Sequence, residues 1–420
     1  MTSARMSQSA HLETLHAQDV AAPPCPHFGP CGGCQLQDLT YSAQLTHKAT
    51  QLRALLEATG LPLPELQLHA SPPLAYRNRI RLTLAEGPGQ LRAGYLTSPA
   101  NNQQPTFLPI TQCPIAAPIL WRATEALLAE LNLRSTVWRE RAPFTLDQVE
   151  LFATPEDAPA EARLQISLVV RTSAKSLPAR FDAELASLCE SLRASIPVLT
   201  GAGLYLIPPR SVRSRRVEQP RLGPSWGSPG LNYTVSPVEP RTPSPEPGPT
   251  YWVPRGAFFQ VNRYLLPQLL ALVTANRRGG LAWDLYAGVG LFTNALAPHF
   301  NRITAVEIAE PAFTALNSGK LPHRHAVKAT TLDFLRSAVL QRERPDFIVL
   351  DPPRTGAGPE VCELLGRVAA PTLLYVSCSP ETLPADLTTL AASGYRVAEL
   401  HLLDLFPQTT HIETIVTLCK

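Results

Sequence analysis

From residue 257 to the C-terminus, short apolar runs alternate with amphipathic stretches, and this alternation constrains the fold more than any other feature. The apolar runs have the length of buried strands, and the amphipathic stretches have the 3.6-residue period of helices. The expected strands lie at Trp283, 303–308, Phe347, Leu373, 397–405 and 412–418, and the expected helices at 291–300, 311–318, 359–368 and 381–393. Repeated strand–helix units form a doubly wound α/β sheet with parallel strands, and the last two strands are expected to pair antiparallel at its edge.

The first half of the chain shows a different, α+β pattern. Residues 39–59 are interpreted as a helix capped by Asp38 and ended by Gly60. Two alternating runs, 79–84 and 91–96, flank a Gly-Pro-Gly turn and predict a β-hairpin. Further helices are expected at 119–131 and 180–194, and further strands at 164–170 and 203–207.

Residues 220–254 are rich in proline, glycine and serine, which predicts a long irregular connection between the two halves. One short strand at 231–235 is compatible with this composition. No run of about 18 apolar residues occurs, so no transmembrane helix is expected. Residues 1–24 lack the charged and apolar regions of a secretory signal, so they are expected to be the disordered leader of a cytoplasmic protein.

The net charge of +3 permits nucleic-acid binding without arguing for it, so the distribution of arginines matters more. Arg77, Arg79 and Arg81 alternate along an expected strand and therefore share one face. Such a face is suited to contact phosphates, and it is equally compatible with a solvated surface. A second group crowds one short segment and comprises Arg210, Arg213, Arg215, Arg216 and Arg221.

The eight cysteines are unevenly spaced along the chain. Cys25, Cys31 and Cys34 form a tight group, whereas the other five are scattered. Because no secretory signal precedes them, a metal site is a better interpretation of this group than a disulfide framework. Thiolates bind both zinc and iron–sulfur clusters, so the chemistry of the ligands leaves these two alternatives open.

A glycine loop follows the expected strand at Trp283 and opens the next helix. A dinucleotide fingerprint requires glycine or alanine three residues after Gly290, and Thr293 stands there instead. A ligand without a pyrophosphate needs only close approach to the backbone, which Gly288 and Gly290 permit. Glu307 ends the next strand, where a carboxylate accepts hydrogen bonds from ribose hydroxyls. This combination is typical of a site for S-adenosylmethionine (SAM).

Three further motifs are expected at the same edge of the sheet, because the carboxyl ends of parallel strands meet there. Asp351 begins an Asp-Pro-Pro-Arg turn, in which two prolines stiffen the backbone. Cys378 follows the strand at Leu373; taken alone, such a cysteine is more often a small core residue. His411 and Glu413 share one face of the last strand by period-2 alternation.

Together these residues describe one reaction, the methylation of C5 of uracil. C5 is a poor nucleophile, but addition of a cysteine thiolate to C6 makes it an enolate-like carbon that attacks the methyl group of SAM. A base must then remove the C5 proton so that elimination frees the cysteine. Cys378 can supply the thiolate, Glu413 the base, and the Gly288 loop with Asp351 the positioning.

The C-terminal half resembles the SAM-dependent RNA uracil-5-methyltransferases. The resemblance rests on five motifs in the family's order, at 258–262, 284–292, 351–354, 375–382 and 404–413. It implies Cys378 as the nucleophile and Glu413 as the general base. It also implies a set of residues around SAM that comprises Gln260, Tyr286, Glu307 and Asp351, with Asp333 near the adenine.

The N-terminal cysteines extend the resemblance. Cys25, Cys31, Cys34 and Cys113 resemble the ligands of a [4Fe–4S] cluster in the ribosomal-RNA branch of this family, which favours iron–sulfur over zinc and makes His27 a bystander. The implied fold is a C-terminal Rossmann-like class I SAM-dependent methyltransferase domain with an N-terminal iron–sulfur segment and a central α+β domain. The expected division is a leader (1–24), the iron–sulfur segment (25–72), an RNA-binding domain (73–219), the connection (220–254) and the methyltransferase domain (255–420).

The resulting expectation is a cytoplasmic enzyme that makes 5-methyluridine in RNA, with 23S ribosomal RNA as the foremost substrate. The same chemistry on transfer RNA is the first alternative, and a non-catalytic iron–sulfur RNA-binding protein is the second. The target base is expected to flip out of its stack to reach Cys378, with Phe258 or Phe259 stacking on it. No membrane and no obligate protein partner is expected.

Overall fold

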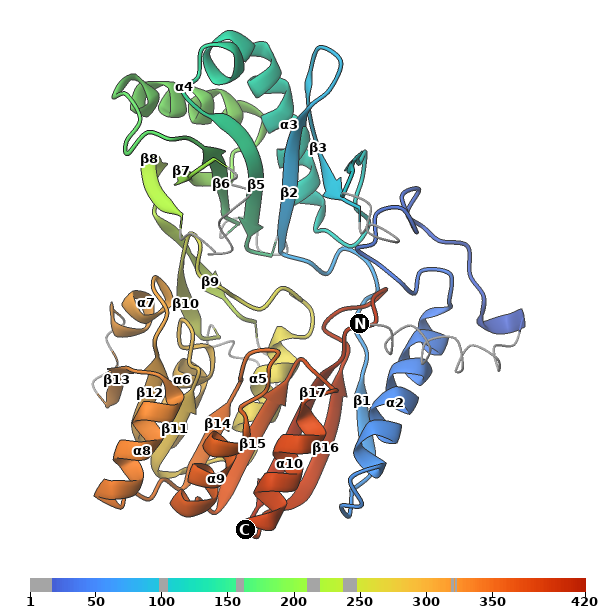
Figure 1. The fold of residues 1–420 in the computed structure, drawn as a ribbon, viewed down its shortest axis with the longest axis vertical. Helices are drawn as coiled ribbons and strands as arrows, with labels where there is room; N and C mark the ends of the chain where they lie inside the picture. The colour runs from blue at the N-terminus through green and yellow to red at the C-terminus, as the bar shows by residue number, and fades with distance from the viewer. Residues whose placement is uncertain are drawn as a thin grey trace, which may run out of the picture.

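The computed structural model describes residues 17–97, 105–155, 162–209, 220–236, 248–318, 321 and 323–420. Within these residues, two large β-sheets lie one above the other, with helices beside them (Figure 1). Most of the expected leader and four arginines of the second group (Arg210, Arg213, Arg215 and Arg216) lie outside the described residues. No helix in the described part of the chain is long and apolar enough to span a membrane.

The lower sheet in Figure 1 has eight strands in the order β1-β16-β17-β15-β14-β11-β12-β13. Its strands are β1 (Leu66–His69), β11 (Gly279–Leu285), β12 (Phe300–Glu307), β13 (Arg324–Lys328), β14 (Phe347–Leu350), β15 (Thr372–Ser377), β16 (Arg396–Leu403) and β17 (Glu413–Cys419). The strands β11 to β15 are parallel, and β17 runs antiparallel to both β15 and β16. The predicted alternation of strands and helices is therefore confirmed, with β13 as an additional strand.

Both faces of this sheet are covered. Neighbouring residues of one strand point to opposite faces, so Ala282 packs in one apolar cluster and Trp283 in the other. The helices of this half are α5 (Leu266–Thr274), α6 (Leu291–Leu296), α7 (Ala312–Ser318), α8 (Thr331–Gln341), α9 (Pro359–Val368) and α10 (Leu383–Ala392). Burial on both faces explains why the strands are continuous apolar runs rather than alternating ones.

The N-terminal segment completes this sheet, which the sequence did not predict. The strand β1 pairs in parallel with β16, and the helix α2 (Tyr41–Glu57) buries Leu52 and Leu56 in the same core. The hairpin of β16 and β17 is therefore interior, and its predicted place at the edge is wrong. The helix begins at Thr40, whose hydroxyl accepts a hydrogen bond from the Ala43 amide at 3.4 Å, so Thr40 rather than Asp38 is the N-cap.

The upper sheet has seven strands in the order β4-β3-β2-β5-β6-β7-β8. They are β2 (Arg79–Glu86), β3 (Leu91–Leu96), β4 (Phe107–Pro109), β5 (Thr145–Ala153), β6 (Leu164–Arg171), β7 (Leu199–Ile207) and β8 (Arg221–Gly227). The predicted hairpin is confirmed by the antiparallel pairing of β2 with β3. The helices α3 (Pro118–Leu133) and α4 (Arg180–Ser195) pack on this sheet and share one apolar core with it.

The expected irregular connection at 220–254 consists largely of strands in its described residues. The strand β8 ends the upper sheet, and β9 (Gly230–Thr234) pairs with β10 (Thr250–Pro254). Pro224 is tolerated within β8 because an edge strand has one side free of ladder hydrogen bonds. Tyr233 and Tyr251 are buried, and their aromatic packing outweighs the proline-rich composition that predicted a loop.

Candidate active site

The carboxyl edge of the lower sheet brings five sequence-predicted side chains into one row. In the strand order β12-β11-β14-β15-β17, the row consists of Glu307, Tyr286, Asp351, Cys378 and Glu413. The first four end parallel strands or directly follow them, and the last begins the antiparallel strand β17. The glycine loop therefore stands at one end of the row, and the thiol and the buried glutamate stand at the other.

Cys378 and Glu413 face each other across an antiparallel strand pair. Ser377 of β15 pairs with Thr414 of β17, so the next residue on β15 stands opposite the preceding residue on β17. Cys378 is a partly exposed free thiol, whereas Glu413 is only 2% exposed. Burial, together with the negative charges of Glu413 and Asp351, raises the pKa of Cys378 to about 11. Burial, with the charge of Asp351, raises the pKa of Glu413 well above its usual range.

The Asp-Pro-Pro-Arg turn places two charges of opposite sign beside this pair. The backbone amide of Asp351 donates to the Leu285 carbonyl at 3.3 Å, and burial, reinforced by Asp284, raises the pKa of the Asp351 carboxyl to about 7. Arg354 is exposed, and its positive charge lowers the pKa of Cys378 against the effect of burial. Arg354 therefore favours the thiolate form.

Asp386, which the sequence analysis missed, holds the loop that follows this turn. Its carboxylate accepts hydrogen bonds from the Tyr375 hydroxyl at 2.5 Å and from the amides of Ala357 at 2.8 Å and Gly358 at 3.1 Å. Tyr375 is fully buried in β15, three residues before Cys378. The loop is thereby tied to the strand that carries the thiol. A lone aspartate on a helix gave no signal of this role.

The glycine loop owes its shape to two left-handed residues and one buried acid. Gly288 and Gly290 have φ of +57° and +90°, and a Cβ at Gly290 would stand 2.9 Å from the Leu316 side chain. The Asp284 carboxylate accepts the Thr293 amide at 2.8 Å and its hydroxyl at 2.5 Å, which fastens the start of α6 to β11. Thr293 stands where a dinucleotide site has a glycine, and it serves here to bind Asp284. Burial raises the pKa of the Asp284 carboxyl to about 7.

Glu307 is linked to the glycine loop directly. One carboxylate oxygen accepts the Gly288 amide at 2.8 Å, and the other accepts the amides of Ile308 at 2.8 Å and Ala309 at 2.6 Å. A carboxylate has about four acceptor positions, and the Gly288, Ile308 and Ala309 amides take up three, so capacity remains for a ribose hydroxyl. Tyr286 has a φ of +63°, a strained conformation for a residue with a side chain, and such strain concentrates at functional sites.

Asp333 has a structural role of its own at the start of α8. Its side chain accepts the Thr330 hydroxyl at 2.7 Å, and its amide donates to the same hydroxyl oxygen at 3.1 Å. Thr330 is thereby the N-cap that satisfies the Asp333 amide, one of those that the first turn of a helix leaves without partners, and the Asp333 carboxylate orients the capping hydroxyl. The Asp333 side chain is exposed and also lies 3.5 Å from Arg336. A contact between Asp333 and an adenine stays a prediction.

The two adjacent phenylalanines have opposite environments. Phe259 is 2% exposed and packs against Tyr233, with ring centroids 4.8 Å apart. Phe258 is 67% exposed. Only Phe258 is therefore free to stack on a base, a distinction that the residue types alone did not reveal.

Gln260 and Asn262 anchor the segment that links the two sheets. Gln260 is buried, and its backbone carbonyl accepts the side-chain amide of Asn78 at 3.0 Å. The fully buried side-chain amide of Asn262 donates to the backbone carbonyls of Asp404 at 3.4 Å and Leu405 at 3.1 Å. The segment is thus fixed beside the loop that joins β16 to β17.

Three cysteines of the N-terminal group and the distant Cys113 line one pocket. Cys25, Cys31, Cys34 and Cys113 surround a cavity of about 100 Å³, several times the roughly 10–15 Å³ that one water requires. Burial raises the pKa of Cys34 to about 12 and that of Cys113 to about 11. Among the described residues, no three His, Cys, Asp or Glu side chains are grouped closely enough to hold one metal ion. The thiols are gathered, but not in the geometry of a single-ion site.

His27 also lines this pocket, but its ring is engaged elsewhere. Its Nε2 accepts the Thr111 amide at 3.0 Å and lies 3.0 Å from the Thr111 hydroxyl. A Cβ at Gly33, which also lines the pocket, would stand 3.4 Å from Cys31 Sγ, so glycine leaves room beside that thiol. That His27 is a bystander stays a prediction.

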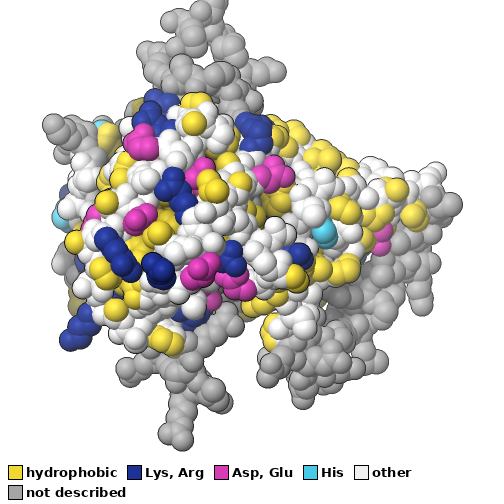
Figure 2. Space-filling model, turned by 90° about the horizontal axis from the view of Figure 1, so that it is seen from above, with side chains coloured by type: hydrophobic (Ala, Val, Ile, Leu, Met, Phe, Trp, Pro, Cys, Tyr) yellow, Lys and Arg dark blue, Asp and Glu magenta, His cyan; other side chains and the backbone are white. Residues whose placement is uncertain are grey.

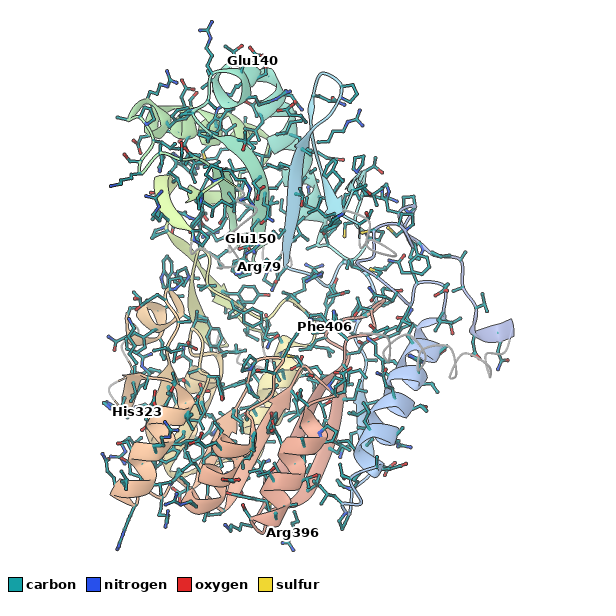
Figure 3. The ribbon with its side chains drawn as sticks, viewed as in Figure 1. Arg79, Glu140, Glu150, His323, Arg396 and Phe406 are labelled. Carbon is teal, nitrogen blue, oxygen red and sulfur yellow. The ribbon has the colours of Figure 1, made fainter. Side chains whose placement is uncertain are left out.

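Arg79 and Arg81 of β2 share a face, as the alternation predicted, and both pair there with the carboxylate of Glu150. Arg79 lies 3.6 Å from Glu150, over the ring of Phe152 at 4.1 Å, and donates to the Ala257 carbonyl at 2.6 Å. Arg81 donates twice to Glu150, at 3.1 and 2.6 Å. Figure 3 places Arg79 and Glu150 between the two sheets. On the face in Figure 2, the coloured basic and acidic side chains are interspersed.

Comparisons with known proteins bear on the family and the fold. The family described as tRNA (Uracil-5-)-methyltransferase matches residues 324–420, which contain Cys378 and Glu413. A 23S rRNA (uracil(1939)-C(5))-methyltransferase RlmD from Chromohalobacter salexigens is 32% identical over 414 residues, which is 95% of this chain and 76% of the relative. The protein of the same description from Pectobacterium atrosepticum is 31% identical and covers 94% of this chain and 79% of its own length.

Among solved structures, the tRNA (uracil-54, C5)-methyltransferase of Pyrococcus abyssi in complex with S-adenosyl-L-homocysteine has a TM-score of 0.66. It is 23% identical and covers 93% of this chain and 86% of its own. This likeness establishes the fold, and the likeness to the sequence relatives extends over most of both chains. The chain therefore belongs to the SAM-dependent RNA (uracil-5-)-methyltransferase family.

Proposed function

We propose that this enzyme transfers a methyl group from SAM to C5 of a uridine in 23S ribosomal RNA, in the cytoplasm. The observation that carries the proposal is the strand register that sets Cys378 opposite Glu413 at the carboxyl edge of the sheet. The two relatives named as 23S rRNA methyltransferases support the substrate class. Transfer RNA is the alternative substrate, because the matching family and the solved neighbour are named for it.

The proposed reaction uses the two facing side chains in turn. The Cys378 thiolate adds to C6 of the flipped uracil, which makes C5 a carbon nucleophile and forms a covalent protein–RNA adduct. SAM supplies the methyl group as an electrophile on a positively charged sulfur. C5 takes this methyl group, Glu413 removes the C5 proton, and the bond between C6 and sulfur breaks to return the thiolate. Neighbouring strands suit these roles because C6, to which the thiolate adds, and C5, which loses its proton to Glu413, are adjacent in the ring.

Gln260, Tyr286, Glu307 and Asp351 are proposed to hold SAM, with Asp333 near its adenine. The left-handed glycines of the loop fit a ligand that approaches the backbone closely. Glu307, already bonded to the Gly288 amide, is proposed to accept a hydrogen bond from the ribose. The negative charge of Asp351 suits the neighbourhood of a sulfonium.

Cys25, Cys31, Cys34 and Cys113 are proposed to hold a [4Fe–4S] cluster. The four thiols line one pocket, which supports a shared inorganic group, and the likeness to the ribosomal-RNA branch of the family favours iron–sulfur over zinc. A four-iron cluster binds each thiolate to a different iron and so accepts a wider ring of sulfurs. The cluster would replace the four thiol protons and join the N-terminal segment to the residues around Cys113.

We expect anaerobically purified protein to be brown and to hold about four irons per chain. The Cys34→Ser variant is expected to lose this iron, because one of the four thiolates is gone, whereas Cys419→Ser, outside the pocket, is expected to keep it. Iron analysis and the visible absorption spectrum measure both. A colourless wild-type protein with one bound zinc would contradict the cluster and leave the methyl-transfer proposal standing.

Phe258→Ala is expected to lower kcat/KM for RNA about 5- to 150-fold. Stacking of one base on an aromatic ring contributes about 1–3 kcal/mol, and Phe258 is exposed, so its removal should leave the melting temperature unchanged. Phe258→Trp keeps an aromatic face and is the matched control. Single-turnover methylation of RNA at a series of RNA concentrations provides the measurement. Wild-type kinetics in Phe258→Ala would exclude the stacking role.

The substrate assignment is tested with methyl-labelled SAM and unmodified ribosomal and transfer RNA. After digestion, labelled 5-methyluridine in 23S rRNA alone is the expected result. Label in transfer RNA alone would keep the reaction and replace the substrate. An intact SAM-binding protein that labels neither RNA would contradict the proposal.

A further inference from the structure

The loop of residues 404–412 joins β16 to β17 and leads directly into Glu413. Gln408 in this loop has a φ of +69°, a conformation that a residue with a side chain keeps only when its surroundings fix it. Figure 3 places Phe406, and with it the loop, at the upper edge of the eight-stranded sheet. The contacts that fix this loop come from the N-terminal part of the chain.

Lys48 of α2 makes the central contact. Its Nζ lies 2.6 Å from Asp404 Oδ1 and donates to the Phe406 carbonyl at 3.0 Å. Neither charged side chain is exposed to solvent at all. In Figure 1, α2 (blue) lies beside β1, which is the strand next to β16 of the hairpin, so the contacts of Lys48 tie the N-terminal segment to the loop that leads into Glu413.

Gln44 makes the second contact, one helical turn before Lys48 and therefore on the same face of α2. Its side-chain amide donates to the Gln408 side chain at 3.0 Å, and its side-chain carbonyl accepts the Gln408 amide at 2.9 Å. The Gln408 carbonyl in turn accepts the amides of Gln35 at 3.0 Å and Leu36 at 3.1 Å. The backbone amide, the backbone carbonyl and the side-chain carbonyl of Gln408 are thus all bound by N-terminal residues.

Two other roles for Lys48, binding of an RNA phosphate and simple stabilisation of the fold, do not fit its environment. A fully buried ammonium cannot contact an RNA phosphate. A buried ion pair is also a weak source of stability, because the loss of hydration often cancels the attraction and an apolar replacement is often neutral. What the pair does provide is a single geometry, since the ammonium binds two groups of the same loop at once.

We propose that Lys48 is a positioning residue for Glu413, and that its ion pair with Asp404 fixes the loop so that the carboxylate can reach the C5 proton. The inference rests on the proposed function, in which Glu413 is the base that resolves the covalent adduct. Proton removal tolerates little displacement, and an error of about 1 Å costs on the order of 10²-fold in rate. The first step, attack by Cys378, comes from a different strand and should be affected less.

The test compares two rates in one single-turnover reaction: formation of the covalent protein–RNA adduct and its resolution to 5-methyluridine. Lys48→Met removes the charge and keeps the apolar stem, and Lys48→Met with Asp404→Asn removes both charges, so that no lone buried ion destabilises the fold. Both variants are expected to resolve the adduct on the order of 10²-fold more slowly, with adduct formation and SAM affinity close to wild type. Gln44→Met, which removes only hydrogen bonds, is expected to slow the same step.

Arg53→Met is the matched control, because Arg53 is an exposed cation on the same helix. Wild-type resolution in a folded double variant would overturn the proposal, as would an equal loss in both steps. If the double variant does not fold, the Gln44→Met result decides in the same way. Glu413→Gln is measured in parallel. If this variant accumulates no adduct, the assignment of Glu413 as the base fails. If Glu413→Gln accumulates adduct but none of the Lys48 and Gln44 variants does, only the role of Lys48 is refuted.

Discussion

Replacement of Cys378 by alanine is expected to abolish methyl transfer and the covalent adduct together. Without the thiolate, C5 of uracil has no activated form, and removal of a covalent nucleophile costs up to about 10⁶-fold in rate. Cys378 is partly exposed and follows β15, away from the glycine loop, so SAM affinity and melting temperature should change little. Transfer of labelled methyl groups to RNA measures the loss of activity, and a denaturing gel measures the loss of the covalent adduct.

Cys378→Ser is the control that keeps the size of the side chain and removes only the thiol. A serine hydroxyl fills the same space but ionises far less readily than a thiol, so this variant should be as inactive as the alanine variant. Cys419→Ser, at the end of β17, is the control for the loss of any thiol. Residual methylation by Cys378→Ala within tenfold of wild type would rule out the proposed covalent route.

Replacement of Glu413 by glutamine is expected to separate the two halves of the reaction. The thiolate can still attack and the methyl group can still transfer, but the C5 proton stays, so a methylated adduct accumulates. It appears as a protein–RNA band that survives denaturation, with turnover lowered about 10²–10⁴-fold, the usual contribution of a general base. Glu381→Gln, an exposed carboxylate after Cys378, is the matched control and should turn over normally.

The same residue predicts the direction of the pH dependence. Because the pKa of Glu413 lies well above its usual range, the carboxylate is protonated and inactive on the acidic side, and adduct resolution should accelerate as the pH rises. Adduct formation should accelerate in the same direction, since the pKa of the Cys378 thiol is about 11. Single-turnover experiments at a series of pH values measure the rates of adduct formation and adduct resolution separately. In Glu413→Gln, the increase of the resolution rate with pH should disappear.

Much of the catalytic half could be predicted from sequence because its signals are local. Apolar runs buried on both faces mark β11, β14 and β15, and the residues directly after them are the ones that the parallel topology gathers. The row from Glu307 to Glu413 therefore follows from strand ends alone. The choice between Phe258 and Phe259 does not, because two adjacent aromatic residues give the same pattern whichever one is buried.

The errors have a common physical cause in long-range packing. The strand β1 is four residues long, and only its pairing with β16 makes it a strand. The strands β8 and β10 lie in a proline-rich segment, where burial of Tyr251 and its neighbours outweighs local preference. Lys48 in an amphipathic helix has the sequence signature of an exposed residue, and its burial depends on Asp404 at the far end of the chain.

The ion pair of Lys48 with Asp404 joins residues that are 356 positions apart, and this separation sets the order of events during synthesis. The ribosome releases α2 and β1 first and the hairpin that receives them last. Until then, Leu52 and Leu56 of α2 have only part of their final core, and such exposed apolar surface attracts chaperones and proteases. A product that stops before residue 396 never acquires β16 or the loop after it. Closure of this part of the fold therefore requires that β16 and β17 have both been synthesised.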